Sequence, residues 1–93
     1  MNEFIPSEFF LSQNYPNPFN PTTSIQIELP EQALVTLEVY NLLGQKIATL
    51  LNKHMQAGSF DVSFNATALP SGMYLYRMQA NGFSSVRKMM LLK

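Results

Sequence analysis

The fold is decided by a run of strict alternation, Thr23-Ser24-Ile25-Gln26-Ile27-Glu28-Leu29 (residues 23–29). From residue 24 onward, polar and apolar side chains alternate, which is the period of a β-strand with one buried face and one solvated face. Pro30 ends the run because proline has no backbone amide hydrogen to donate to a neighbouring strand. The run therefore predicts a strand at the surface of a packed core.

Similar short runs recur along the chain and are separated by turn residues. Gly44 lies in a predicted turn over residues 41–45 and is expected to have a positive φ, and Asn81-Gly82 is typical of a type I′ hairpin. Residues 73–80 are apolar or long-chained on both faces, which favours a central strand covered on both sides, whereas residues 51–57 could form a single helical turn, too short to be stable alone. We predict seven strands, over residues 9–11, 23–29, 35–40, 46–50, 60–64, 73–80 and 83–92.

This turn spacing is typical of an all-β sandwich or barrel. The length of 93 residues allows a single domain. We expect residues 1–13 to form a linker with a possible first strand, and residues 14–93 to form a β-sandwich. Three prolines within residues 16–21 exclude a helix there, so this part should be an irregular lead-in that Phe19 anchors to the core. The first four residues, Met1-Asn2-Glu3-Phe4, do not resemble the start of a signal peptide.

Composition excludes several classes of function. Six basic and six acidic side chains leave no net charge and no basic stripe, so we expect no binding of nucleic acid or anionic lipid. No apolar run approaches the roughly 20 residues that span a bilayer, so we expect no membrane insertion. The absence of cysteine rules out disulfides and thiolate metal sites.

The chain has few groups that could support catalysis. It contains one histidine, His54, expected in a connecting loop, and one aspartate, Asp61, expected on the polar side of a strand. No nucleophile-elbow sequence surrounds any serine. Glu28 and Glu38 are expected on the solvated faces of neighbouring strands, where surface charges are common. We therefore predict no catalytic residues, no cofactor and no metal site.

The last segment, Val86-Arg87-Lys88-Met89-Met90-Leu91-Leu92-Lys93, carries half of the basic residues. Lys88 and Lys93 could protect an edge strand against unwanted pairing. Alternatively, the segment could be a recognition strand that a partner reads by backbone pairing and by the flanking charges. Adjacent side chains of a strand point to opposite faces, so one of Met89 and Met90 should be partly exposed.

Five blocks of the sequence resemble type A C-terminal sorting domains of the type IX secretion system, in order and over residues 11–93. The resemblance implies an immunoglobulin-like, seven-stranded antiparallel sandwich that is appended to large secreted enzymes or adhesins of Bacteroidota-type bacteria. The blocks are Leu11-Ser12-Gln13-Asn14-Tyr15-Pro16-Asn17-Pro18-Phe19-Asn20-Pro21-Thr22-Thr23, Val39-Tyr40-Asn41-Leu42-Leu43-Gly44-Gln45, Ala57-Gly58, Ser71-Gly72-Met73-Tyr74-Leu75-Tyr76-Arg77 and Lys88-Met89-Met90-Leu91-Leu92-Lys93.

The resemblance also implies a function as a non-catalytic export signal. Such a domain takes a fused N-terminal cargo from the periplasm through an outer-membrane translocon to the cell surface or the medium. A sortase-like enzyme then usually removes the domain, by a cut that would fall in or ahead of residues 1–13. The residues implied in recognition by the secretion machinery are Gly72, Tyr74, Lys88, Met89, Leu91 and Lys93.

Two other functions stay open at this point. The blocks around residues 40–44 and 71–77 are also similar to the immunoglobulin-like module of flagellar hook-capping proteins, which is structural. A carbohydrate-binding sandwich is a further alternative, with exposed aromatic side chains such as Tyr15 and Tyr40 as candidate sugar contacts.

Overall fold

The computed structural model describes residues 5–93, so the predicted lack of a signal peptide at Met1-Asn2-Glu3-Phe4 lies outside the described residues. Within that range the chain has no helix of the length and apolarity needed to cross a membrane. The strands are β1 (Phe10–Leu11), β2 (Thr22–Leu29), β3 (Ala33–Tyr40), β4 (Lys46–Met55), β5 (Gly58–Asn65), β6 (Gly72–Ala80) and β7 (Phe83–Leu91).

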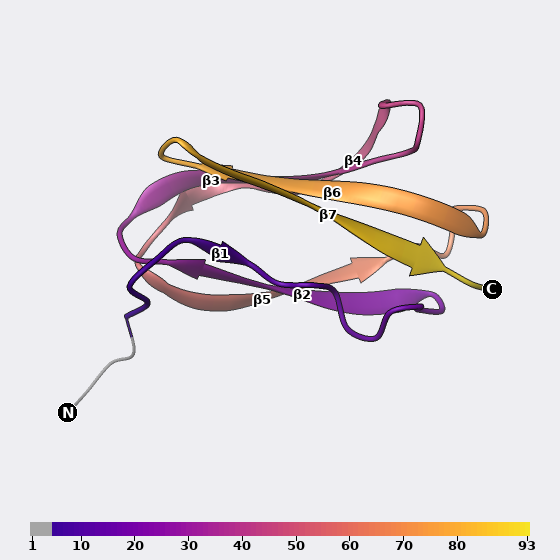
Figure 1. The fold of residues 1–93 in the computed structure, drawn as a ribbon, viewed down its shortest axis with the longest axis horizontal. Helices are drawn as coiled ribbons and strands as arrows, with labels where there is room; N and C mark the ends of the chain where they lie inside the picture. Colours follow the sequence, from indigo (N-terminus) through magenta and orange to yellow (C-terminus); the bar gives the residue numbers. More distant parts are fainter. Residues whose placement is uncertain (1–4) are drawn as a thin grey trace.

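The strands form two antiparallel sheets that pack face to face (Figure 1). One sheet has the order β1-β2-β5 and the other the order β4-β3-β6-β7. The chain crosses between the sheets after β2, β4 and β5, which is the connectivity of an immunoglobulin-like sandwich whose fourth strand pairs with the third. The predicted all-β, seven-stranded antiparallel sandwich is confirmed.

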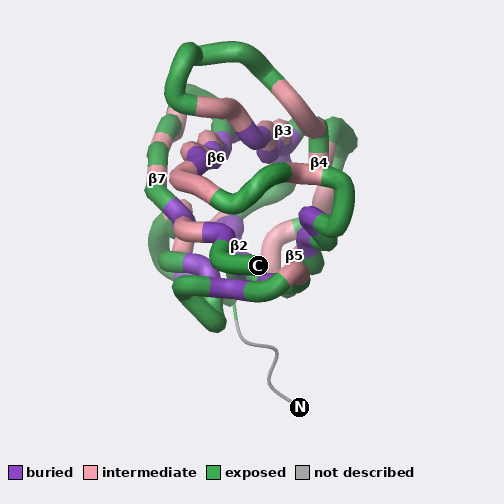
Figure 2. Tube along the Cα trace, turned by 90° about the vertical axis from the view of Figure 1, so that its right-hand side faces the viewer, coloured by how far each residue is buried: buried purple, intermediate pink, exposed green. Residues whose placement is uncertain are grey.

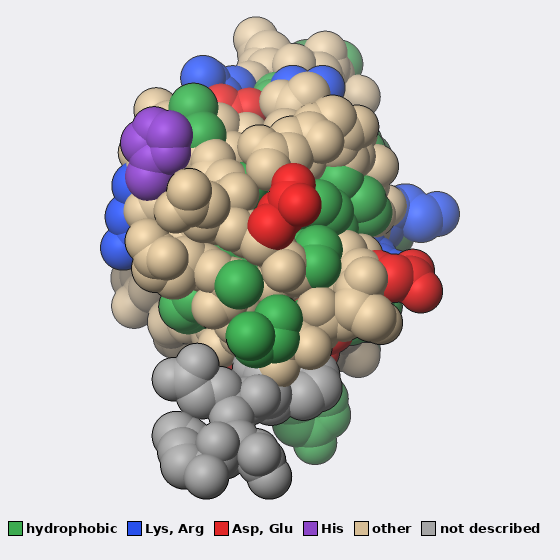
Figure 3. Space-filling view, turned by 90° about the vertical axis from the view of Figure 1, so that its left-hand side faces the viewer, with side chains coloured by type: hydrophobic (Ala, Val, Ile, Leu, Met, Phe, Trp, Pro, Cys, Tyr) green, Lys and Arg blue, Asp and Glu red, His purple; other side chains and the backbone are tan. Residues whose placement is uncertain are grey.

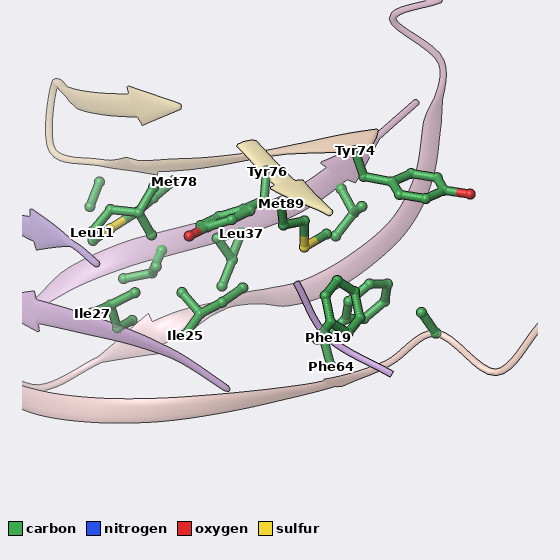
Figure 4. Close-up of a cluster of buried hydrophobic side chains, with 14 of the residues drawn as sticks. Leu11, Phe19, Ile25, Ile27, Leu37, Phe64, Tyr74, Tyr76, Met78 and Met89 are labelled. Carbon is green, nitrogen blue, oxygen red and sulfur yellow. The ribbon is translucent and has the colours of Figure 1, made fainter. Parts of the chain in front are cut away.

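The core lies between the two sheets and follows the predicted alternation. Ile25, Ile27 and Leu29 of β2 are completely buried, while the side chains between them are exposed or only partly buried. Figure 2 shows the same alternation of buried and exposed positions along the strands. Phe19 and Phe64 lie side by side in the core, with ring centroids 6.3 Å apart (Figure 4). The prediction that Phe19 anchors the proline-rich lead-in is confirmed.

The predicted turns also have the expected backbone. Gly44 has φ 83°, and the Asn81-Gly82 pair has φ 45° and 86°, as a type I′ hairpin requires. A side chain at Gly44 or Gly82 would meet no neighbouring atom, so it is the positive φ that favours glycine there.

The interpretation of residues 51–57 as a helical turn is wrong. Strand β4 runs on to Met55, which pairs with Ala33, because β3 offers a free edge along its whole length. Backbone pairing with a formed strand outweighs the weak helical preference of so short a segment. His54 therefore lies within β4 and not in a connecting loop.

Two further expectations about neighbours need correction. Glu28 and Glu38 are not on neighbouring strands, since β2 and β3 belong to different sheets. Strand β6 is central, between β3 and β7, but it is covered on one face only. Its outward residues, such as Leu75, are partly exposed, because the outer surface of this sheet faces solvent and not a second core.

Candidate functional site

The six residues implied in recognition come together at one corner of the sandwich. Strand β6 begins beside the end of β7, so that Gly72 pairs with Leu91 and Tyr74 pairs with Met89. The backbone amide of Lys93 donates to Ser71 Oγ at 3.0 Å, which holds the chain end against the start of β6. We call Gly72, Tyr74, Lys88, Met89, Leu91 and Lys93 the recognition corner.

Three side chains of the recognition corner point into the core. Met89 and Leu91 are completely buried, and Tyr74 is 6% exposed. The Tyr74 hydroxyl donates to Pro70 O at 2.7 Å, four residues upstream, where the chain enters β6. This bond corresponds to the tyrosine corner of immunoglobulin-like sandwiches. In the folded domain these three side chains shape the corner but offer little surface to a partner.

The remaining side chains of the corner reach the surface. Lys88 and Lys93 are both exposed, and the Lys93 ammonium group donates to the carbonyl of Thr67. Met90 is partly exposed while Met89 is buried, as predicted from the alternation. Gly72 has φ 152°, and a side chain there would meet no neighbour, so its conformation favours glycine. A partner would therefore meet two ammonium groups beside a partly apolar strand end.

Over this same stretch, the edge of β7 that does not pair with β6 is covered by an earlier segment of the chain. The proline segment, which we define as residues 12–21, runs along it and bonds to backbone groups that point away from β6. Phe19 N donates to Met90 O at 2.9 Å and Leu92 N donates to Phe19 O at 3.0 Å. Side chains add two more bonds, from Met90 N to Asn17 Oδ1 at 2.9 Å and from Gln13 Nε2 to Lys88 O at 2.6 Å.

The first half of the β7 edge is different. Both backbone groups of Met90 bond to the proline segment, so the alternate residues Val86 and Ser84 also turn their backbone groups away from β6. None of the hydrogen bonds of residues 5–93 that lie outside the ladders involves the backbone of either residue. Strand β1 packs beside β7 in this part of the chain, whereas at residues 88–92 the proline segment occupies the edge by hydrogen bonds.

The residues considered for catalysis are not assembled. His54 on β4 and Asp61 on β5 are both exposed and belong to different sheets. In Figure 3 the histidine lies at the surface, and the charged side chains on that end are spread out and not gathered into one patch. No group of three or more potential metal ligands occurs among residues 5–93. Tyr15, the first candidate sugar contact, is 81% exposed beside β2, on the opposite sheet from Tyr40.

A charged network on the outer face of the four-stranded sheet was not found from the sequence. Glu38 accepts a hydrogen bond from the Tyr40 hydroxyl at 2.7 Å, and it also lies 3.3 Å from Lys46 Nζ and 3.7 Å from Arg77 Nη2. The Tyr40 bond, followed by the two cations, lowers the pKa of Glu38, and the same bond to Glu38 raises the pKa of Tyr40. Alternation puts residues 38 and 40 on one face, but only strand pairing reveals Arg77 as their neighbour.

A comparison with family models decides the family. A model described as the secretion system C-terminal sorting domain matches residues 13–92, nearly the whole chain. The chain belongs to this family. A search of curated proteins found no match to the chain.

The resemblance to type IX sorting domains is thereby confirmed. Sorting domains of this family are non-catalytic signals that interact with the type IX machinery, are fused to an N-terminal cargo and lead to export to the cell surface or the extracellular space. The match covers five of the six residues of the recognition corner, all but Lys93.

Proposed function

We propose that this sorting domain directs a fused, folded cargo through the outer-membrane translocon of the type IX system, with transit through the periplasm. Residues 14–93 would act as the sorting domain and residues 1–13 would link it to the cargo, although Leu11 already belongs to the packed core. The proposal rests mainly on one observation. Two sequence blocks about fifteen residues apart, at the start of β6 and the end of β7, form one surface corner.

The translocon and the sortase-like components would read this corner through its exposed side chains. Lys88 and Lys93 supply two positive charges, and the buried Tyr74, Met89 and Leu91 hold the strand end in place. Gly72 supplies the backbone conformation at the start of β6. Direct backbone pairing at residues 88–92 is the less accessible route, because the proline segment already occupies that edge.

The test replaces Lys88→Gln and Lys93→Gln together in a chain that carries a folded reporter cargo, in cells with a type IX system. Both side chains are exposed, so the free energy of unfolding should change by no more than about 0.5 kcal/mol. We expect the cargo to remain in the periplasm. Lys53→Gln is the matched control, since Lys53 is an exposed lysine of β4 near the opposite end of the sandwich.

The same experiment separates recognition from edge protection. If the two lysines only protect the β7 edge, the double variant should be exported but should aggregate once purified. Normal export of the soluble double variant would contradict a role of either lysine in recognition.

A further inference from the structure

Two leucines are presented to solvent at the tip of the turn between β3 and β4. Leu42 is 66% exposed and Leu43 is 83% exposed, and no other large apolar residues sit next to each other with comparable exposure among residues 5–93. Exposing such side chains at a turn gives no folding benefit, because polar residues form turns equally well. An exposed apolar pair of this kind is a candidate surface for contact with another molecule.

Hydrogen bonds fix the backbone of the turn that carries the two leucines. Asn41 Oδ1 accepts hydrogen bonds from Leu43 N at 2.9 Å and Gln45 N at 3.0 Å, and Asn41 Nδ2 donates to Gln45 Oε1 at 2.7 Å. Gly44 N donates to Asn41 O at 3.0 Å, and its positive φ closes the turn. A partner would pay little ordering entropy to bind a tip that is already fixed.

The turn adjoins the outer face of the four-stranded sheet, where Tyr40, the residue before the turn, pairs with Leu75. Direct strand partners form two adjacent rows there, Tyr40-Leu75-Lys88 and Glu38-Arg77-Val86. Between them and the turn lies a shallow, mostly apolar depression of about 260 Å³, lined by Tyr40, Gly44, Leu75, Arg77 and Val86. We call Leu42, Leu43, Leu75 and Val86 the leucine face.

Basic groups surround the leucine face. Lys46 and Lys88 are exposed on either side of it, and Arg77 lies over the Tyr40 ring at 5.2 Å from its centroid. The carboxylate of Glu38, in the adjacent row, is only 16% exposed and already pairs with Lys46 and Arg77. The surroundings therefore present net positive charge to an approaching molecule, which favours a partner with acidic groups.

The position of the face relative to the termini limits what can cover it. The described chain starts at the end of the sandwich opposite the turn, and the C-terminus lies at the same end as the turn (Figure 1). A cargo attached at the N-terminus therefore leaves the leucine face free. We infer that the leucine face docks a protein of the export machinery through an apolar contact surface flanked by carboxylates, as a second contact beside the recognition corner. This inference rests on the proposed export function.

The test replaces Leu42→Ser and Leu43→Ser together in the cargo-bearing chain and measures the exported fraction of cargo. Neither side chain belongs to the core and Asn41 and Gly44 are retained, so the melting temperature should not change. We expect loss of export, and a smaller loss for Lys46→Gln. Leu34→Ser is the matched control, because Leu34 is an exposed leucine on the same sheet near its other end and should export normally.

Each outcome decides between explanations. Normal export of the double-leucine variant, with retention of the Lys88→Gln, Lys93→Gln variant, overturns this inference and leaves the proposed function intact; export of both overturns both. Sedimentation of the purified chain provides a further check. A dimer that the leucine substitutions dissociate would make a second copy the occupant, and binding to phosphatidylglycerol vesicles that they abolish would make it a lipid surface. Either result overturns the inference.

Discussion

The two long sides of the sandwich differ in how they are closed. On the side of β1 and β7, the proline segment bridges the sheets, and Leu11, Phe19, Met89 and Leu91 are buried there. On the side of β4 and β5, the sheets are joined by the short connection at residues 56–57. Figure 2 shows these two sides on opposite flanks of the domain. We call them the closed side and the open side.

The closed side is sealed by hydrogen bonds to both sheets. Tyr15 exchanges two backbone bonds with Ser24 of β2, each of 2.9 Å, before the segment reaches β7. The Tyr76 hydroxyl donates to Ser12 O at 2.7 Å, and Arg87 Nε donates to Leu11 O at 3.0 Å. These bonds satisfy carbonyl groups that an irregular segment would otherwise leave unpaired beside the core.

The open side is packed less completely. Strand β4 contributes none of the buried core residues of the described chain, and β5 contributes only Phe64. Their apolar side chains, such as Leu50, Phe60 and Val62, are only partly buried. Two register shifts in the pairing of β3 with β4 disturb the alternation of β4, since a bulge re-aims the side chains around it.

This difference shows where an irregular segment can matter more than a regular strand. The proline segment forms few ladder bonds, yet it excludes water from one side of the core and fixes the strand that carries the recognition corner. Strand β4 is the longest strand and pairs with β3 over its whole length, yet it covers little of the core. The stability of this sorting domain should therefore depend more on the closed side.

The largest expected effect tests that difference with one residue type. Phe19→Ala should lower the free energy of unfolding by about 3–5 kcal/mol, because a completely buried ring is replaced by a cavity. Phe60→Ala, on the open side, should cost about 1–2 kcal/mol, since the ring is already partly solvated. Urea unfolding of both variants measures the difference. Equal losses would show that the two sides are sealed equally well.

A smaller effect is expected from a buried amide of the closed side. Asn14 Nδ2 donates to Thr23 Oγ1 at 3.0 Å and to Pro16 O at 3.1 Å, and the side chain is 2% exposed. Asn14→Ala should cost about 1–3 kcal/mol, because both hydrogen bonds of a buried amide group are lost. Asn52→Ala, at an exposed site of β4, should stay within about 0.5 kcal/mol. If Asn14→Ala leaves the free energy of unfolding unchanged, the hydrogen bonds of Asn14 do not stabilise the closed side.

The smallest effect concerns alkaline pH. Burial raises the pKa of Tyr76 from 10 to about 12, so its contribution to stability is complete below pH 10 and is lost as the pH rises through about 12. Tyr76→Phe should cost about 1–2 kcal/mol at neutral pH, because Ser12 O loses its donor, and should flatten the fall in stability between about pH 10 and 12. Urea unfolding across this pH range, with the exposed Tyr15→Phe as control, measures the effect. If stability falls with alkaline pH as steeply in the Tyr76→Phe variant as in the unchanged chain, the Tyr76 phenol is not buried in its neutral form.

Much of the recognition corner could be anticipated from sequence motifs, but not its exposure. The motifs pointed to residues of β6 and β7, and the structure places them side by side. Alternation alone left open whether Met89 or Met90 is buried. The buried face of β7 is the face on which the second sheet packs, and alternation does not say which face that is. The occupied edge of β7 could not be foreseen either, since nothing local to residues 13–19 indicates which strand they will contact.

The sequence by itself determined most of the strands and their turns, because alternation, Gly and Pro act over a few neighbouring residues. It also carried the motifs of the sorting domain. Only the tertiary structure decided that β4 extends to Met55, that Glu38 meets Arg77, and that the proline segment covers half of the β7 edge. Those features depend on contacts between residues far apart in the chain, and strand partners are selected by the packing of two whole sheets rather than by any local pattern.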